Sequence, residues 1–212
     1  GDGVWEGQWA RHIAQLRLDT QQNLEWSAPL GLESAVATAL PRYFGLHRDY
    51  AEIINTLPWR CDDHLRSAID AWPGLRTLNQ PLGETVLTFL CSSNKQIVQI
   101  KQISHDLARN LGSEVCPGFH ALPTWEELRG VSEIRLRRCR LGYRARYIRA
   151  TARFLADHPG YLEEVAALPY PDAQDQLTRL SGVGNKVADC ILLFGAGRLE
   201  VFPVDVWIRK TM

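Results

Sequence analysis

The sequence predicts a mainly helical protein with a small antiparallel β-sheet at its N-terminal end, which is an α+β fold. Apolar and polar residues alternate over residues 9–18, and residues 23–26 could form the partner strand of a hairpin. From Leu32 onward, apolar residues instead recur at spacings of three and four, as on one face of a helix. We therefore expect part of a sheet domain over residues 1–31 and a helical region over residues 32–212.

The helical region is expected to contain eight or more short helices, whose limits are marked by capping residues, prolines and glycines. Asp62 or Asp63 can cap one helix, and Thr124 with Glu127 three residues later predicts a capping box for another. Gly142 stands between two further helices. The expected helices cover residues 33–44, 49–57, 62–72, 81–91, 97–111, 132–141, 143–156, 161–168, 172–180 and 184–195, and others begin after Thr124 and Asp205.

Composition and charge narrow the class of protein. The chain has 212 residues, 45% of them hydrophobic and 23% charged, with a formal net charge of zero, which is typical of a globular protein and excludes one that coats polyanions. Its five cysteines are odd in number and lack CxxC spacing, so we expect reduced thiols rather than a disulfide or zinc framework. No signal peptide opens the chain and no stretch approaches the ~20 apolar residues of a membrane span. We therefore expect an intracellular protein that is neither secreted nor membrane-bound.

A run of arginines is the most basic part of the chain. Eight arginines and no acidic residue lie between positions 135 and 153. They are Arg135, Arg137, Arg138, Arg140, Arg144, Arg146, Arg149 and Arg153. Such a run could form a phosphate-binding surface, or it could be the solvated face of helices. The run alone does not decide between these two interpretations.

Two glycines separated by one residue, Gly182 and Gly184, precede an apolar helix and predict a helical hairpin over about residues 178–190. In such a hairpin the glycine amides and the N-terminus of the second helix can bind a phosphate. Contacts made through backbone amides suit sequence-independent binding to a nucleic-acid backbone. Glycine pairs are also common at the ends of helices that bind no ligand, so the motif indicates phosphate binding only together with the helices on either side of it.

Lys186 lies in the first turn of this helix, where the helix dipole opposes a positive charge. A lysine held there could supply a neutral amine nucleophile, or it could be an exposed residue that bridges to phosphate. The helix up to Gly195 is about 18 Å long. The seven residues before Asp205 can span about 23 Å, so the chain returns close to Lys186. Asp205 can also cap the next helix, which is by itself a sufficient reason for an aspartate.

Three stretches together resemble a known family. LSGVGNKVADC at 180–190 with FPVDVWIRK at 202–210 resembles the helix-hairpin-helix base-excision DNA glycosylases, the HhH-GPD superfamily. CSSN at 91–94 and LGYRARYIRATA at 141–152 narrow the resemblance to the 8-oxoguanine DNA glycosylases. The resemblance covers residues 80–210 and implies a glycosylase fold that is truncated at both ends, without the first strand of its sheet and without its C-terminal helix.

By this resemblance the chain is an enzyme, a bifunctional DNA glycosylase and lyase. It implies that Lys186 attacks the sugar C1′, forms a Schiff base and allows the strand to be nicked by β-elimination. It implies that Asp205 stabilises the positive charge that develops on the sugar. The damaged nucleotide must first be flipped out of the stack. Cys190, Pro203 and Asp205 are then expected to line the pocket for the damaged base.

The resemblance also assigns DNA contacts. Asn94 would fill the space that the flipped base vacates, Tyr143 would wedge into the stack, and Arg144 would read the opposite cytosine. The alternatives are a helix-capping asparagine, a core tyrosine and a solvated arginine. Gln99 stands where eukaryotic members have a second cytosine-reading arginine, so we expect weaker discrimination for cytosine. Further DNA contacts are implied for Gly182, Gly184 and Val187.

The expected partner is double-stranded DNA containing 8-oxoguanine opposite cytosine, bound by a DNA-associated monomer in a nucleoid or nucleus. No cofactor is required for the chemistry, but the family binds a cation through hairpin carbonyls, which here are those of Thr178, Leu180 and Val183. Trp207 replaces a histidine that often follows PVDV, which puts one phosphate contact in doubt. Two alternatives remain: a helix-hairpin-helix glycosylase for another lesion, and a non-catalytic helix-hairpin-helix module that only holds DNA.

Overall fold

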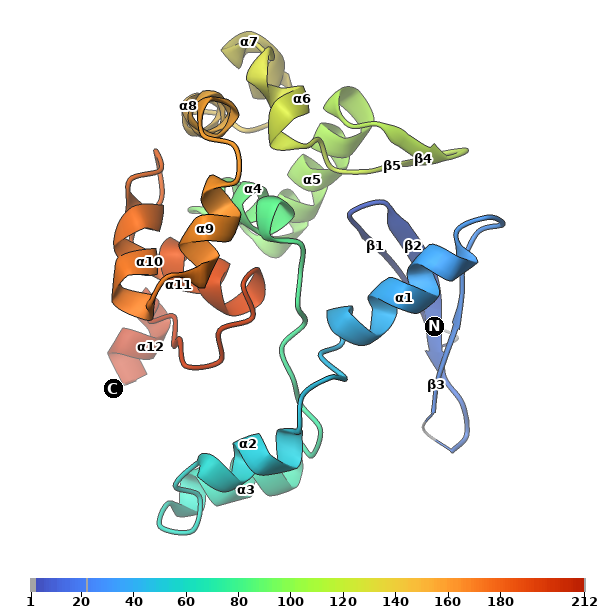
Figure 1. Ribbon diagram of the computed structural model, residues 1–212, viewed down its shortest axis with the longest axis vertical. Helices are drawn as coiled ribbons and strands as arrows, with labels where there is room; N and C mark the ends of the chain where they lie inside the picture. The colour runs from blue at the N-terminus through green and yellow to red at the C-terminus, as the bar shows by residue number, and fades with distance from the viewer. Residues whose placement is uncertain (1–2, 22, 212) are drawn as a thin grey trace.

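The computed structural model describes residues 3–21 and 23–211 and is mainly helical, with a three-stranded antiparallel sheet at the N-terminal end (Figure 1). The strands are β1 (Val4–Trp9), β2 (His12–Leu18), β3 (Leu24–Ser27), β4 (Glu114–Cys116) and β5 (Phe119–His120). The first helices are α1 (Glu33–Tyr43), α2 (Tyr50–Thr56), α3 (Asp63–Ala71), α4 (Leu82–Ser92), α5 (Ile97–Leu111) and α6 (Trp125–Arg129). They are followed by α7 (Glu133–Arg138), α8 (Arg144–Asp157), α9 (Tyr161–Ala167), α10 (Tyr170–Thr178), α11 (Asn185–Phe194) and α12 (Val206–Thr211). The predicted fold class is confirmed.

The front sheet differs in one respect from the prediction. The expected strand over residues 9–18 is β2, which starts only at His12, because Ala10 turns the chain with a positive φ of 48° and leads back to an additional strand, β1, that pairs antiparallel with β2. β1 was missed because its sequence, VWEGQW, keeps mostly exposed side chains and shows little alternation. α1 packs on this sheet through a small core that includes Trp9 and Val36.

The helices follow the predicted order, with ends that differ from the prediction by at most three residues. Asp62 caps α3, and Thr124 with Glu127 forms the predicted capping box of α6. Pro81 occupies the capping position of α4 instead of its first turn, since the helix begins at Leu82. The short hairpin of β4 and β5 was not predicted. Two- and three-residue strands are too short to show an alternating pattern.

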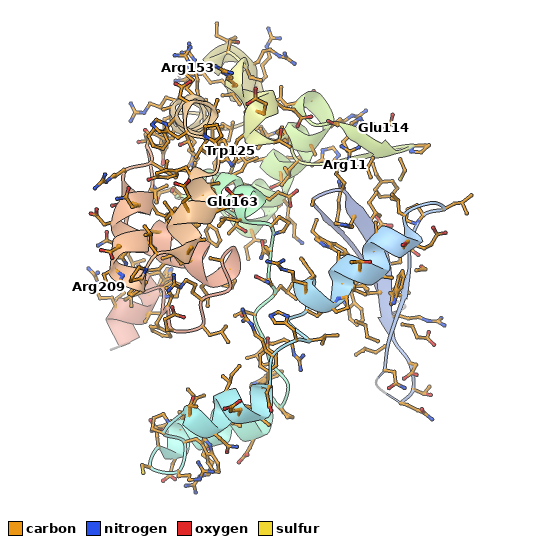
Figure 2. All side chains as sticks on the ribbon, viewed as in Figure 1. Arg11, Glu114, Trp125, Arg153, Glu163 and Arg209 are labelled. Atoms are coloured by element: carbon orange, nitrogen blue, oxygen red, sulfur yellow. The ribbon has the colours of Figure 1, made fainter. Side chains whose placement is uncertain are left out.

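The main core lies among α4, α5 and the helices from α6 to α11, and it contains most of the large buried side chains. α2 and α3 project away from it as a helical pair without fully buried residues (Figure 1). The turn between β1 and β2 reaches the β4–β5 hairpin at Arg11, whose Nη2 donates to the carbonyl oxygen of Glu114 on β4 at 3.4 Å (Figure 2). None of the helices in the described ranges has the length and apolarity needed to cross a bilayer.

Candidate active site and DNA-contact surface

The helical hairpin predicted around the glycine pair is formed by α10, a short turn and α11. Gly182 has a φ of +87°, and a Cβ there would lie 2.7 Å from ring carbons of Tyr147 on α8. Both the conformation and the contact therefore require glycine. Gly184 is different, because its φ is −103° and a Cβ there would meet no atom within 4 Å. Its open side, at the N-terminus of α11, leaves room for a molecule to approach the backbone.

A buried aspartate that sequence reasoning did not single out fixes the two helices of the hairpin. Asp189 on α11 accepts hydrogen bonds from the Tyr170 hydroxyl at 3.0 Å and from Gln174 Nε2 at 2.6 Å, both on α10. Burial, and the hydrogen bond to the carboxylate, raise the pKa of Tyr170. The sequence did offer a signal for this role, because Asp189 is an acidic residue within an otherwise apolar helix, and aspartates are rarely buried without a partner.

Lys186 and Asp205 are brought to the same thiol. Cys190 lies one turn after Lys186 on α11 and is 3% exposed. Burial raises the pKa of Cys190, the hydrogen bond and charge of Lys186 oppose this rise, and the carboxylates of Asp189 and Asp205 add to it. The three side chains thus form one cluster at the mouth of the hairpin. Lys186 itself is exposed, and its Nζ lies 5.4 Å from the ring centroid of Phe89 on α4.

Asp205 also has the capping role that the sequence allowed. Its Oδ1 accepts hydrogen bonds from the backbone amides of Trp207 and Ile208, each at 2.9 Å, at the start of α12. These bonds fix the carboxylate at the start of α12, from where its charge influences the thiol of Cys190. Pro203 is half-buried in the segment that leads to Asp205, and the Trp207 side chain is 71% exposed.

The predicted DNA-reading residues also lie together. Asn94, with a φ of +51°, is exposed in the turn after α4, and Arg144 Nη2 donates to the carbonyl oxygen of Ser93 in the same turn. The Arg144 guanidinium also lies 4.3 Å from the ring centroid of Tyr143. Tyr143 in turn meets the ring of Tyr147 edge-on, with centroids 5.9 Å apart. Since Tyr147 contacts Gly182, these turns and the hairpin form one continuous surface.

Arg144 is not the solvated arginine that the sequence left open as an alternative. Its side chain is 4% exposed, and its Nη1 donates to the carbonyl oxygen of Leu141 at 3.5 Å. The carbonyl oxygens of Leu141 and Ser93 accept hydrogen bonds from part of this guanidinium, which helical periodicity alone would place in solvent. Arg137 and Arg140 pair with Glu133 and Asp106, whereas Arg153 is exposed on α8 (Figure 2).

The remaining predicted residues have local roles in the free protein. Gln99 lies in the first turn of α5, where its Oε1 accepts the backbone amide of Gln96 at 3.2 Å and caps its own helix. Val187 is half-buried against the main core at the start of α11. Their contacts with DNA stay predictions.

The cation expected in the hairpin would be bound by backbone carbonyls. The carbonyl oxygen of Leu180 accepts the amide of Val183 at 3.0 Å, which leaves it a second lone pair for a cation. Thr178 ends α10 beside it. Within the described ranges, no group of three or more His, Cys, Asp and Glu side chains could hold a metal ion. The carbonyl site stays a prediction.

These features define a class of protein: a helix-hairpin-helix protein whose glycine turn, open at Gly184, lies beside a lysine, a cysteine and an aspartate. Family comparison gives the same answer. The chain belongs to the HhH-GPD superfamily of base excision DNA repair proteins, whose family model matches residues 87–212.

Similar proteins agree with this family. The chain is 37% identical over 174 residues to the probable N-glycosylase/DNA lyase of Methanothermobacter thermautotrophicus, covering 71% of this chain and 55% of that protein. It is 32% identical over 195 residues to the N-glycosylase/DNA lyase of Saccharomyces cerevisiae, covering 85% of this chain and 51% of the relative. The chain thus spans about half the length of these curated relatives.

A solved structure matches nearly the whole chain. It is the 8-oxoguanine glycosylase/lyase of Clostridium acetobutylicum, in complex with double-stranded DNA that contains cytosine opposite 8-oxoguanine. Its TM-score is 0.87 at 27% identity, and the match covers 99% of this chain and 71% of that one.

Proposed function

We propose that this protein is a bifunctional DNA glycosylase and lyase that flips 8-oxoguanine out of duplex DNA, removes it through a lysine Schiff base, and nicks the strand. The observation that carries the proposal is the cluster of Lys186, Cys190 and Asp205 at the mouth of the hairpin. The alternative is that Lys186 is an ordinary exposed lysine without a chemical role. Its hydrogen bond to a buried thiol, on which the carboxylate of Asp205 also acts, favours a chemical role.

The proposed chemistry uses each member of the cluster. The Lys186 amine attacks C1′ as the N-glycosidic bond breaks, and the base leaves with the bonding electron pair. Asp205 stabilises the positive charge on the sugar and helps to remove the proton from the new amine. Opening of the sugar ring gives the Schiff base, and loss of a C2′ proton then expels the 3′ phosphate. Cys190 lines one face of the damaged base.

The surface beside the cluster suits duplex DNA. The open side of Gly184 allows a phosphate to approach the amides at the N-terminus of α11. Asn94 and Tyr143 are both exposed on turns that Arg144 joins, which suits residues that enter the duplex next to a flipped nucleotide. To read the opposite cytosine, Arg144 would exchange its carbonyl acceptors for the O2 and N3 atoms of the base. The proposed partner is therefore double-stranded DNA, bound by a monomer that needs no cofactor for its chemistry.

The test is trapping of the Schiff base. The protein is incubated with duplexes that contain 8-oxoguanine opposite each of the four bases, and borohydride is added to reduce any imine to a stable adduct. We expect an adduct with the wild type and with Lys101→Gln, an exposed lysine on α5, but none with Lys186→Gln. An adduct that survives Lys186→Gln would overturn the nucleophile assignment.

The other two functions predict different results. A helix-hairpin-helix glycosylase for another lesion would form adducts with duplexes containing that lesion but not with 8-oxoguanine. A non-catalytic module would bind duplex DNA without forming any adduct. Pre-formed abasic sites, tested in parallel, show whether the lyase step works when base recognition does not.

A further inference from the structure

One face of α11 carries the reactive lysine and two other side chains at helical spacing. Lys186, Cys190 and Phe194 are four residues apart, so they lie along one stripe of the helix. α11 packs against α4. The close approach of the two helices is set at Gly195, where a Cβ would lie 3.0 Å from side-chain atoms of Leu82 and Thr85.

Phe89 of α4 faces this stripe. The Nζ of Lys186 lies 5.4 Å from the centroid of its ring, within the range of a cation–π interaction. The ring is stacked on Phe194, with centroids 5.8 Å apart and an interplanar angle of 16°. Both rings are half-buried, and Phe89 also packs against the main core. The ring is therefore held in place independently of the lysine that it contacts.

We propose that Phe89 is a positioning residue for Lys186, whose ring holds the amine beside Cys190 and stabilises the positive charge that Nζ acquires as its bond to the sugar forms. This proposal rests on the function proposed above. It adds a residue from α4 to a cluster otherwise supplied by α11 and the segment before α12.

The charge arises in the covalent step. With the open-chain sugar of an abasic site, the Nζ lone pair forms a bond to the aldehyde carbon. A proton passes from nitrogen to oxygen, and protonation of this hydroxyl lets water leave. The product is a protonated imine with its positive charge on the former lysine nitrogen, which borohydride reduces by hydride transfer to carbon. The negative face of an aromatic ring stabilises this charge, whereas an aliphatic side chain of similar size does not.

The ring face attracts a lysine ammonium as well as the cationic transition state, and this predicts a particular pH dependence. Where Lys186 is mostly an ammonium, the ring stabilises the starting state and the transition state equally, so its loss has little effect. Where the amine is mostly neutral, the ring stabilises only the transition state, so its loss slows the reaction. Lys186 hydrogen-bonds the thiol of Cys190, which the carboxylates of Asp189 and Asp205 also influence, and replacing Phe89 leaves all three groups in place.

The experiment compares Phe89→Leu and Phe89→Tyr with the wild type. Single-turnover rates of borohydride trapping are measured at saturating duplex with one abasic site, from about pH 6 to about pH 10. Phe154→Leu is the matched control, because Phe154 is a half-buried aromatic residue on α8 that stacks on His158, away from the cluster. We expect the ratio of wild-type to Phe89→Leu rates to rise with pH towards roughly two- to thirty-fold. Phe89→Tyr and Phe154→Leu should stay near the wild-type rate throughout.

Three outcomes would overturn the proposal while leaving the proposed function intact. They are a wild-type rate for Phe89→Leu at every pH, a reduction that is the same at every pH, and a failure of Phe89→Tyr to restore the rate. If the wild type itself forms no adduct, the proposed function fails instead. Should Phe89→Leu melt earlier than Phe154→Leu, a multiply fluorinated phenylalanine at position 89 keeps the shape and weakens the ring face. Its rate should then fall at high pH, and an unchanged rate contradicts the proposal.

Discussion

The two glycines of the hairpin should respond to alanine in opposite ways, because only one of them is required by the free protein. Gly182→Ala places a Cβ at a φ of +87° and 2.7 Å from the Tyr147 ring. The left-handed conformation costs about 1–2 kcal/mol and the overpacked ring about 1–3 kcal/mol, offset by about 0.4–1 kcal/mol from the less flexible unfolded chain. The net loss is roughly 1–5 kcal/mol, or a melting temperature about 2–20 °C lower for a chain of this size.

Gly184→Ala should leave the free protein almost unchanged. Its backbone, at φ −103° and ψ 176°, suits any residue, and a Cβ would point into open space. Stability should therefore stay within about 0.5 kcal/mol of the wild type. Duplex binding should nevertheless weaken by about ten-fold, because the methyl group would occupy the space through which a phosphate reaches the helix amides.

Thermal unfolding and duplex binding measured on both variants decide the matter. The reasoning about Gly182 is refuted if Gly182→Ala melts with the wild type. The reasoning about Gly184 is refuted if Gly184→Ala binds duplex as the wild type does, or if it destabilises the fold as much as its neighbour. A binding loss in Gly184→Ala without a change in melting temperature would show that this glycine serves the ligand and not the fold.

Two further predictions concern specificity and pH. Gln99→Arg should sharpen the preference for cytosine. Trapping rates are compared across the four opposing bases, because a loss of stability from the missing Gln99–Gln96 hydrogen bond affects all four rates equally. Unchanged ratios would contradict the role of position 99 in reading the opposite base. Burial raises the pKa of Glu84 in the folded protein above its usual 4.5. The contribution of Glu84 to folding stability is therefore fully present below the pKa that it has in the unfolded chain, and it is lost as the pH rises through the pKa that it has in the folded protein. Glu84→Gln keeps an acceptor for the Ala10 amide. Its melting temperature should be higher than that of the wild type at about pH 7 and the same as that of the wild type at about pH 4. Equal melting temperatures at both pH values would contradict this account of Glu84.

The parts of the structure that could be predicted from sequence are those controlled by local chemistry. Capping residues such as Asp62 and Thr124 mark helix ends because they bond to amides two or three residues away. The return of Asp205 to the hairpin also followed from chain length alone. The burial of Arg144 did not, because it depends on the Ser93 carbonyl, which a turn fifty-one positions earlier in the chain supplies. Phe89 likewise reads as an ordinary core residue until the packing of α4 on α11 brings its ring to Lys186.

α4 contacts both the cluster around Lys186 and the surface formed by Asn94, Tyr143 and Arg144. Phe89, in its last turns, contacts the lysine, and Ser93 at its C-terminal end accepts the guanidinium of Arg144. Between them Cys91 is fully buried next to Arg144, and burial raises its pKa to about 12, so it acts as a small apolar side chain that fills the core. The base-reading role proposed for Arg144 and the positioning role proposed for Phe89 therefore both depend on contacts with α4.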